Sequence, residues 1–298
     1  MADIASDKLS IALTGLPLSG CSLMGQLLGH HPRIYSPPFR SPLCGALSRL
    51  RRSLTDHPDL RVQMDADFDL IDQRMVNAFR GFLNGWFAET LKPVVVDTSP
   101  DWLGMIEILH RLDPEFRMIV CVRDLRRIFG AMESRHRRSP LLGFPDGPSA
   151  HSPRRRADVL FGADGAIGKP LRAIRDLLDL DGPLKAQTCY VTFEALVSQP
   201  LKTMETIYQW LALPHAPFDP ENLDLPDSPP PDRSRFKYQH RIRSRIRPPA
   251  IHPVPAAIAD NITHDFKWFF DQLYPSPQAA DHRAGIGLDE NETATTEG

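Results

Sequence analysis

The chain has 298 residues, of which 42% are hydrophobic and 24% charged, and its formal net charge at pH 7 is −2. These values indicate a soluble globular protein with one sizeable core. The near-neutral charge gives no overall attraction to nucleic acid or to anionic membranes, so an anion site must come from local clustering. No window of 18 apolar residues predicts a membrane span, and the N-terminal segment lacks the pattern of a signal peptide.

Four strands are predicted in chain order by short apolar, β-branched runs. They cover Leu9–Leu16, Lys92–Asp97, Phe116–Val122 and Thr188–Phe193. The three consecutive valines of the second run are typical of a parallel strand buried on both faces.

Helical spacing separates these runs. It begins directly after the turn Pro17–Gly20 and recurs at Leu103–Leu112, Leu125–Arg138, Leu171–Leu178 and Leu201–Leu211. Strands that alternate with helices predict a three-layer α/β fold with a central, mostly parallel sheet flanked by helices. Ligands of such sheets bind outside the carboxyl ends of the strands.

Three stretches interrupt the alternation. A loop rich in proline and arginine follows Arg138, and Pro217–Arg235 is rich in proline and predicted to be extended. Residues 275–298 are polar and small, which predicts a disordered tail. We therefore expect one domain over residues 1–274, with a loop-rich C-terminal lid at about 217–255.

The four cysteines, Cys21, Cys44, Cys121 and Cys189, are far apart in the sequence and form no CxxC pair. This spacing argues against a zinc site and a disulfide framework, and it fits a reducing, cytoplasmic location. Cys121 and Cys189 lie inside apolar runs, so we expect them to be buried, inert thiols.

A candidate phosphate loop runs from Gly15 to Ser22 (GLPLSGCS), between the first strand and the first helix. Its spacing is that of G-x-x-x-x-G-K-[ST], with Cys21 in place of the lysine. Backbone N–H groups at a helix N-terminus form an anion cradle, to which the Ser22 hydroxyl adds a donor. The alternative is a plain strand–turn–helix corner. Without the lysine and an acid to hold Mg²⁺, a kinase that uses ATP is disfavoured.

This loop resembles the phosphosulfate loop G-x-P-R-S-G-[ST]-[ST] of the sulfotransferase family. Gly15, Pro17, Ser19, Gly20 and Ser22 match it. Leu18 and Cys21 depart from it.

The resemblance extends over several further motifs in the right order. The stretches GQLLGHHPRIYSPPFRSPL, VVVDTSPDWLGMIEILHRLDPEFRMIVCVRD and VTFEALVSQPLKTMETIYQWLALP are similar to motifs of the bacterial branch, and YQHRIRSRIRPP to its basic C-terminal loop. The similarity spans about Ile11 to Pro249 and implies a P-loop-type fold.

The resemblance implies 3′-phosphoadenosine-5′-phosphosulfate as the donor, with no metal. The loop, Cys21 included, would hold the 5′-phosphosulfate. Arg123, Arg241 and Arg243 would hold the 3′-phosphate, because a planar guanidinium suits phosphate recognition. Ala131 stands where the family has a serine. Outside the resemblance, Arg123 can equally pair with Asp124.

The acceptor would be an unknown hydroxyl or amine, and the resemblance implies His240 as the base that takes its proton. Other candidate bases are His30, His31, Asp97 and Glu133. The segment 97–100 lacks the cation that the family places there, and Arg40, Arg126 and Arg127 are possible substitutes. The region 49–86 is the expected place for acceptor contacts.

These departures leave a second function open, in which the protein binds a nucleotide or a protein partner without turnover. The sequence does not indicate an oligomeric state.

Overall fold

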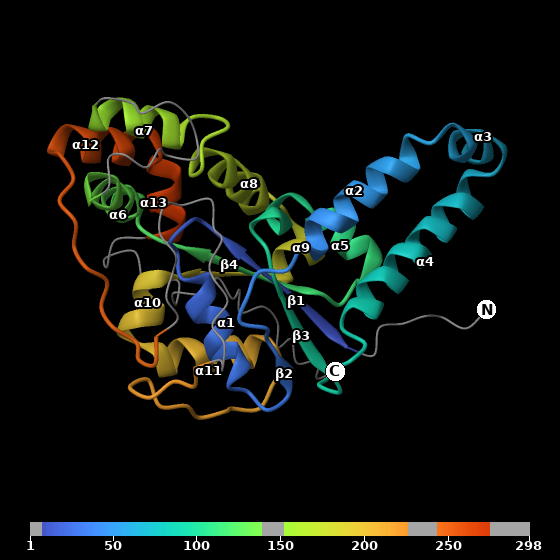
Figure 1. Cartoon of the computed structure of the whole chain (residues 1–298), viewed down its shortest axis with the longest axis horizontal. Coiled ribbons are helices and arrows are strands. Elements are labelled where there is room, and N and C mark those ends of the chain that lie inside the picture. Colours follow the sequence, from blue (N-terminus) through green and yellow to red (C-terminus); the bar gives the residue numbers. More distant parts are fainter. Residues whose placement is uncertain (1–7, 139–151, 226–242, 275–298) are drawn as a thin grey trace, which may run out of the picture.

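The computed structural model of the chain describes residues 8–138, 152–225 and 243–274. Its centre is a five-stranded, all-parallel sheet with the order β2-β3-β1-β4-β5 (Figure 1). The strands are β1 (Leu9–Gly15), β2 (Ile34–Tyr35), β3 (Val94–Thr98), β4 (Arg117–Val122) and β5 (Thr188–Thr192). The four predicted strands and the parallel sheet are confirmed, whereas the two-residue β2 is too short to carry a periodic signal.

Helices cover both faces of the sheet. One face packs against α1 (Cys21–Gly29), α10 (Phe193–Ser198) and α11 (Pro200–Trp210). The opposite face packs against a larger set: α2 (Leu43–Thr55), α4 (Phe68–Trp86), α5 (Ile106–Leu112), α6 (Leu125–Arg138), α7 (Pro153–Phe161), α8 (Gly168–Leu178), α12 (Ala256–Asp265) and α13 (Lys267–Leu273). The remaining helices are α3 (Pro58–Ala66), α9 (Gly182–Ala186) and the 3₁₀ helix η1 (Pro100–Gly104).

The alternation of side chains along β4 divides the core into two layers. Met118, Val120 and Val122 point into the larger cluster, and Ile119 and Cys121 point toward α1 and α11. Successive side chains of a strand point to opposite faces, so a strand that is apolar throughout must be covered on both. The predicted three-layer arrangement is therefore confirmed.

Two helical predictions need correction. The segment predicted as one helix over 103–112 is divided, because η1 ends at Gly104 and α5 begins at Ile106. The proline- and arginine-rich stretch after Arg138 contains α7, where a loop was predicted. Ser152 caps α7 by accepting the N–H of Arg155 at 3.2 Å, with Pro153 in the first turn. A serine followed by proline is a helix-start signal that the composition obscured.

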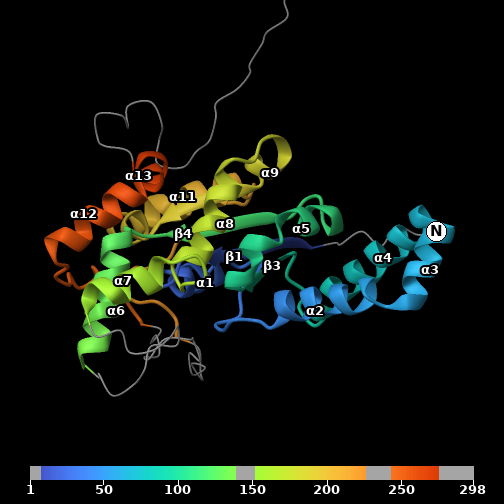
Figure 2. The same cartoon turned by 90° about the horizontal axis from the view of Figure 1, so that it is seen from above.

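The helices α2, α3 and α4 extend away from the sheet as an arm (Figures 1 and 2). They contain the region 49–86, where acceptor contacts were expected. No helix within the described ranges has the length and apolar character needed to cross a bilayer. The predicted tail 275–298 and most of the predicted lid lie outside the described residues.

Candidate functional site

The candidate site lies at the carboxyl edge of the sheet. The central strand β1 ends at Gly15, where it pairs with Cys121 of β4, and β3 ends beside it at Thr98. From β1 the chain continues to β2 and β3, which lie on one side of β1, whereas β4 and β5 lie on its other side. The strand order therefore reverses between β1 and β4. Parallel α/β sheets bind their ligands at such a point.

The loop from Gly15 to Ser22 needs its glycines. At Gly15 φ is +147°, and a Cβ would lie 2.0 Å from the carbonyl oxygen of Cys121. At Gly20 φ is +96°, and a Cβ would lie 2.6 Å from the ring of Phe193. Both positions combine a left-handed backbone with close contact, which L side chains do not tolerate. The plain-corner alternative requires only the backbone angles, whereas this loop is also packed against β4 and α10.

The turn at residues 16–19 is held from within. Ser19 donates its hydroxyl hydrogen to the carbonyl of Leu16 at 2.6 Å, which uses the Ser19 side chain inside the loop. Leu18 has φ of +60°, an uncommon conformation for a residue with a side chain. Helix α1 then begins after Gly20 with no side chain capping its first turn, and Ser22 is exposed there. The first N–H groups of α1 are therefore open to an anion.

Arg123 faces this loop from the end of β4. It is 6% exposed, its Nη1 donates to the carbonyl oxygen of Leu18 at 3.1 Å, and its guanidinium lies 4.7 Å from the centre of the Phe193 ring. Its Nε is buried without a hydrogen-bond partner. Burial lowers the pKa of Arg123, but a guanidinium remains charged at neutral pH. A buried cation with an unused donor fits an anionic ligand.

The alternative pairing of Arg123 with Asp124 is not what the structure contains. The Asp124 carboxylate accepts hydrogen bonds from Arg126, with Nη2 2.5 Å from Oδ2 and Nε 3.0 Å from Oδ1. Burial raises the pKa of Asp124, but the hydrogen bonds and charge of Arg126 outweigh it and lower the pKa overall. Arg126 is thus the hydrogen-bonding partner of Asp124, whereas the negative charge that acts most strongly on Arg123 is that of Glu194.

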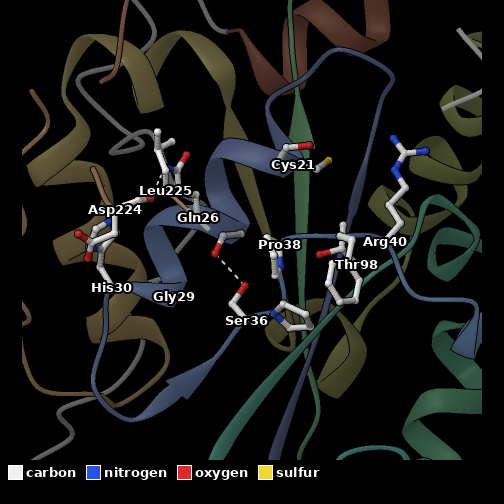
Figure 3. A pocket seen from close by; sticks show the side chains of 14 residues that line it. Cys21, Gln26, Gly29, His30, Ser36, Pro38, Arg40, Thr98, Asp224 and Leu225 are labelled. Atoms are coloured by element: carbon white, nitrogen blue, oxygen red, sulfur yellow. Dashed lines mark hydrogen bonds and ion pairs between the residues drawn. The ribbon is translucent and has the colours of Figure 1, made fainter. Parts of the chain in front are cut away.

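A pocket of about 220 Å³ opens beside α1, next to the phosphate loop. Figure 3 shows Cys21, Thr98 and Arg40 toward one end of it and His30 with Asp224 at the other. Arg40, which the sequence offered only as a substitute cation, lines the pocket together with Cys21. Sequence reasoning did not identify Gln26, Thr98 or Asp224, because their segments meet only in the fold.

Two candidate bases are engaged elsewhere. His31 is buried between the carbonyl of Pro214 and the N–H of Arg33, at 3.1 and 3.0 Å. Glu133 binds two arginines of α6 and α7.

Asp97 is engaged only in part: its Oδ2 accepts a hydrogen bond from the Trp102 indole at 2.7 Å, whereas its Oδ1 is buried without a hydrogen-bond partner. Burial raises the pKa of Asp97, although hydrogen bonds from Ser41 and Trp102 oppose this.

His30 lines the pocket but stands far from the loop. Its Nδ1 is 3.4 Å from Oδ2 of Asp224, and its Nε2 is buried without a hydrogen-bond partner. It follows Cys21 by nine positions along α1, which corresponds to roughly 13 Å along a helix axis. A base must reach the reacting proton within hydrogen-bond distance or through one water, so His30 is too distant from the cradle.

The basic C-terminal segment is described only in part. His240 and Arg241 lie outside the described residues. Arg243 is exposed, and its carbonyl oxygen accepts a hydrogen bond from Gln26 of α1 at 3.1 Å. The same Gln26 amide donates to the carbonyl of Asp224 at 2.9 Å. The described part of the basic segment is therefore hydrogen-bonded to α1 beside the pocket.

Comparison with known proteins identifies the family of the chain. The model of the sulfotransferase family matches residues 10–217. The sulfotransferase domain of the olefin synthase from Synechococcus PCC 7002 has a TM-score of 0.50 at 18% identity, covering 90% of this chain and 97% of that domain. The sulfotransferase domain from the curacin biosynthetic pathway has a TM-score of 0.49 at 16% identity, covering 89% and 99%. No curated protein matches the chain significantly.

Proposed function

The chain belongs to the sulfotransferase family, and we propose that it transfers a sulfonate group from 3′-phosphoadenosine-5′-phosphosulfate to a hydroxyl or amine acceptor. The observation that carries this proposal is the contact of Arg123, a buried guanidinium with an unused Nε, with the loop that leads into an uncapped helix N-terminus. Two anion-binding elements at one edge of the sheet suit a nucleotide that carries phosphate groups at both its 3′ and 5′ positions.

The cradle would hold the 5′-phosphosulfate. The N–H groups at the start of α1 and the exposed Ser22 hydroxyl supply hydrogen-bond donors, and Gly20 lets the backbone approach closely. In the reaction, the acceptor oxygen or nitrogen bonds to sulfur while the bond from sulfur to the 5′-phosphate oxygen breaks. The electron pair stays on that phosphate, and the acceptor proton passes to a base. Catalysis then depends on alignment and on stabilising the charge of the leaving phosphate.

Arg40 is the proposed cation at the reacting end. The family places a cation near residues 97–100, where this chain has none, and an arginine at position 18, where this chain has leucine. Arg40 lines the same pocket as Cys21 and Thr98, and its exposed side chain is free to reorient toward a bound anion. A guanidinium forms paired hydrogen bonds with oxyanions, so one well-placed arginine can replace a lost donor.

The 3′-phosphate would lie at Arg123, with Arg241 and Arg243 as its proposed partners. Ala131 offers no hydroxyl at this position. His240 is the proposed base. It stands three residues before Arg243 in the sequence, and the similarity of this segment to the basic loop of the family is what supports the role.

The test is thermal unfolding with adenosine 3′,5′-bisphosphate, the product left after transfer. Ligand at about 100 times its Kd should add about 2.7 kcal/mol of stability, which raises the Tm by roughly 5 to 10 °C for a protein of this size. ATP and adenosine 5′-monophosphate serve as controls, because neither carries a 3′-phosphate.

A matched pair of variants on β4 locates the effect. Arg123→Gln should abolish the rise, whereas Arg117→Gln should keep it, because Arg117 begins the same strand at the opposite edge of the sheet. No rise with millimolar bisphosphate in the natural protein would overturn the donor assignment. An equal rise with all three nucleotides would show that the 3′-phosphate is not recognised.

A further inference from the structure

Three of the four cysteines meet behind the phosphate loop. Cys121 lies opposite Gly15 in the register of β1 and β4, and Cys189 lies on the neighbouring strand β5, on the same face of the sheet. Cys21 is the first residue of α1. The sequence separates Cys21 from Cys121 by 100 positions, so only the fold brings them together.

Cys21 and Cys121 are neighbours at the base of the loop, on the same side of the sheet. The Cys21 Sγ lies 3.3 Å from the carbonyl oxygen of Thr14 and 3.6 Å from the Ser19 hydroxyl, inside the curve of the loop. Thr14 directly precedes Gly15, and Gly15 pairs with Cys121 in the register of β1 and β4. The backbone of Leu16 also donates to the carbonyl of Cys121 at 3.0 Å, which ties this part of the loop to β4.

The two thiols differ in access and in acidity. Cys21 lines the pocket and is partly exposed, whereas Cys121 is fully buried. The hydrogen bond from Cys121, with smaller effects of Ser19 and Arg40, lowers the pKa of Cys21 against the opposing effect of burial. The same hydrogen bond and burial raise the pKa of Cys121. An accessible thiol that ionises first, beside a buried thiol that follows, is the arrangement of a reactive and a resolving cysteine.

We propose that Cys21 is an oxidation site, at which a peroxide produces a reversible disulfide with Cys121 that disables the phosphate loop. The Cys21 thiolate attacks one oxygen of hydrogen peroxide, and with one proton this gives the sulfenic acid and water. The sulfur of Cys121 then attacks the Cys21 sulfur, forming the S–S bond and releasing a second water. In total, two thiols are oxidised to one disulfide, and one peroxide is reduced to two waters.

The bond would act on the cradle directly. Joining Cys21 to β4 draws the first turn of α1 toward the strand and fixes the N–H groups that form the cradle. The proposed disulfide depends only on the positions of Cys21 and Cys121, whereas its effect on nucleotide binding rests on the proposed function.

Peptide mapping of the full-length protein tests the disulfide. After treatment with hydrogen peroxide and digestion with trypsin, residues 9–33 and 118–123 should appear as one cross-linked species that separates on reduction. In Cys121→Ala, Cys21 should stop at the sulfenic acid and react with a cyclic 1,3-diketone. In Cys21→Ser, residues 118–123 should remain a free thiol peptide.

Cys44→Ala is the matched control, because Cys44 lies in the other core layer and burial raises its pKa to about 12. It should form the cross-link as the natural protein does. Peptides 9–33 and 118–123 that remain separate after oxidation would overturn the proposal. A cross-link from 9–33 to residues 186–202, which contain Cys189, would also overturn the assignment to Cys121.

Nucleotide binding tests the consequence. Oxidation should weaken binding of adenosine 3′,5′-bisphosphate by about 10- to 100-fold, which corresponds to the loss of one hydrogen bond to a charged group, and reduction should restore it. An affinity that oxidation leaves unchanged would overturn the inhibitory role. If the reduced protein does not bind the bisphosphate at all, the proposed function fails, and the peptide map still decides the disulfide.

Discussion

Replacing Glu133 with glutamine should destabilise the protein by about 3 to 5 kcal/mol, the usual cost of removing one partner from a buried ion pair. The Glu133 side chain is 2% exposed and that of Arg156 9%. Arg156 binds the carboxylate through two nitrogens, at 2.8 and 2.6 Å, and Arg137 adds a third contact at 3.0 Å. The neutral amide leaves the buried Arg156 guanidinium without its carboxylate, so α7 loses its charged attachment to α6.

Urea unfolding at neutral pH measures this cost, and the Tm should fall by roughly 6 to 20 °C. Arg137→Gln is the control. The Arg137 side chain is 56% exposed, and exposed ion pairs contribute about 1 kcal/mol or less. A loss of stability below about 1 kcal/mol for Glu133→Gln would refute the reasoning, because removing the carboxylate from a buried ion pair should cost more than that.

The pH dependence supplies an independent check on the same pair. Burial would raise the pKa of Glu133, but hydrogen bonds from Arg156 and Arg137 outweigh it and lower the pKa. A carboxyl whose pKa is lowered by folding contributes stability above its unfolded pKa, about 4.3, and loses it as the pH falls through the folded value. The stability difference between the natural protein and Glu133→Gln should therefore be full at pH 7 and shrink in acid.

Three further outcomes are expected. Arg40→Gln should lower the rate of sulfonate transfer at saturating donor by about 10² to 10³, and Arg40→Lys should retain part of the rate. An unchanged rate for Arg40→Gln would show that Arg40 does not act in the site. Gly15→Ala should fail to give a cooperative thermal transition, because its Cβ meets the Cys121 backbone. Gly81→Ala, at an exposed position of α4, should stabilise the protein by about 0.5 to 1 kcal/mol. Two stable variants would contradict the packing argument. His30→Gln should keep the transfer rate within about twofold because His30 stands roughly 13 Å along α1 from the cradle, and a large loss would place the reaction at the other end of the pocket.

The sheet was predictable because its strands carry their own signal. Three valines at 94–96 and the apolar run 118–122 are buried on both faces, so their composition alone identifies parallel strands. The two residues of β2 have no pattern of their own and depend on pairing with Val94 and Val95. Helix α7 was not predicted because its arginines are typical of a solvent-exposed loop. One of them, Arg156, is instead buried and paired with Glu133.

The candidate site was predictable only where one continuous segment builds it. The spacing from Gly15 to Ser22 identifies the cradle, because a strand, a glycine turn and a helix follow each other directly. The pairing of Asp124 with Arg126, the presence of Arg40 and Cys21 in one pocket and the position of Cys121 beside Gly15 all arise only in the folded chain. Sequence spacing contains no information about such contacts between separate segments.

The departures from the family pattern are easier to understand once the contacts of the loop are considered. The group at position 18 that meets Arg123 is a backbone carbonyl, which any residue provides, and the φ of +60° at Leu18 belongs to the turn that presents it. Leucine at position 18 therefore removes one positive charge from the site, but it keeps the backbone carbonyl that binds Arg123.

Arg40 lies at the end of the pocket where Cys21 and Thr98 also lie, and it is the proposed source of the missing charge. The two glycines are required by the packing of the loop against β4 and α10 whatever the loop binds, so the feature that points to a ligand is the buried Arg123 with an unused donor. Burying such a charge costs free energy unless a partner compensates for it. These features support a donor site that has been rearranged around Arg40 and Cys21, in which the thiol at the helix start adds sensitivity to oxidation.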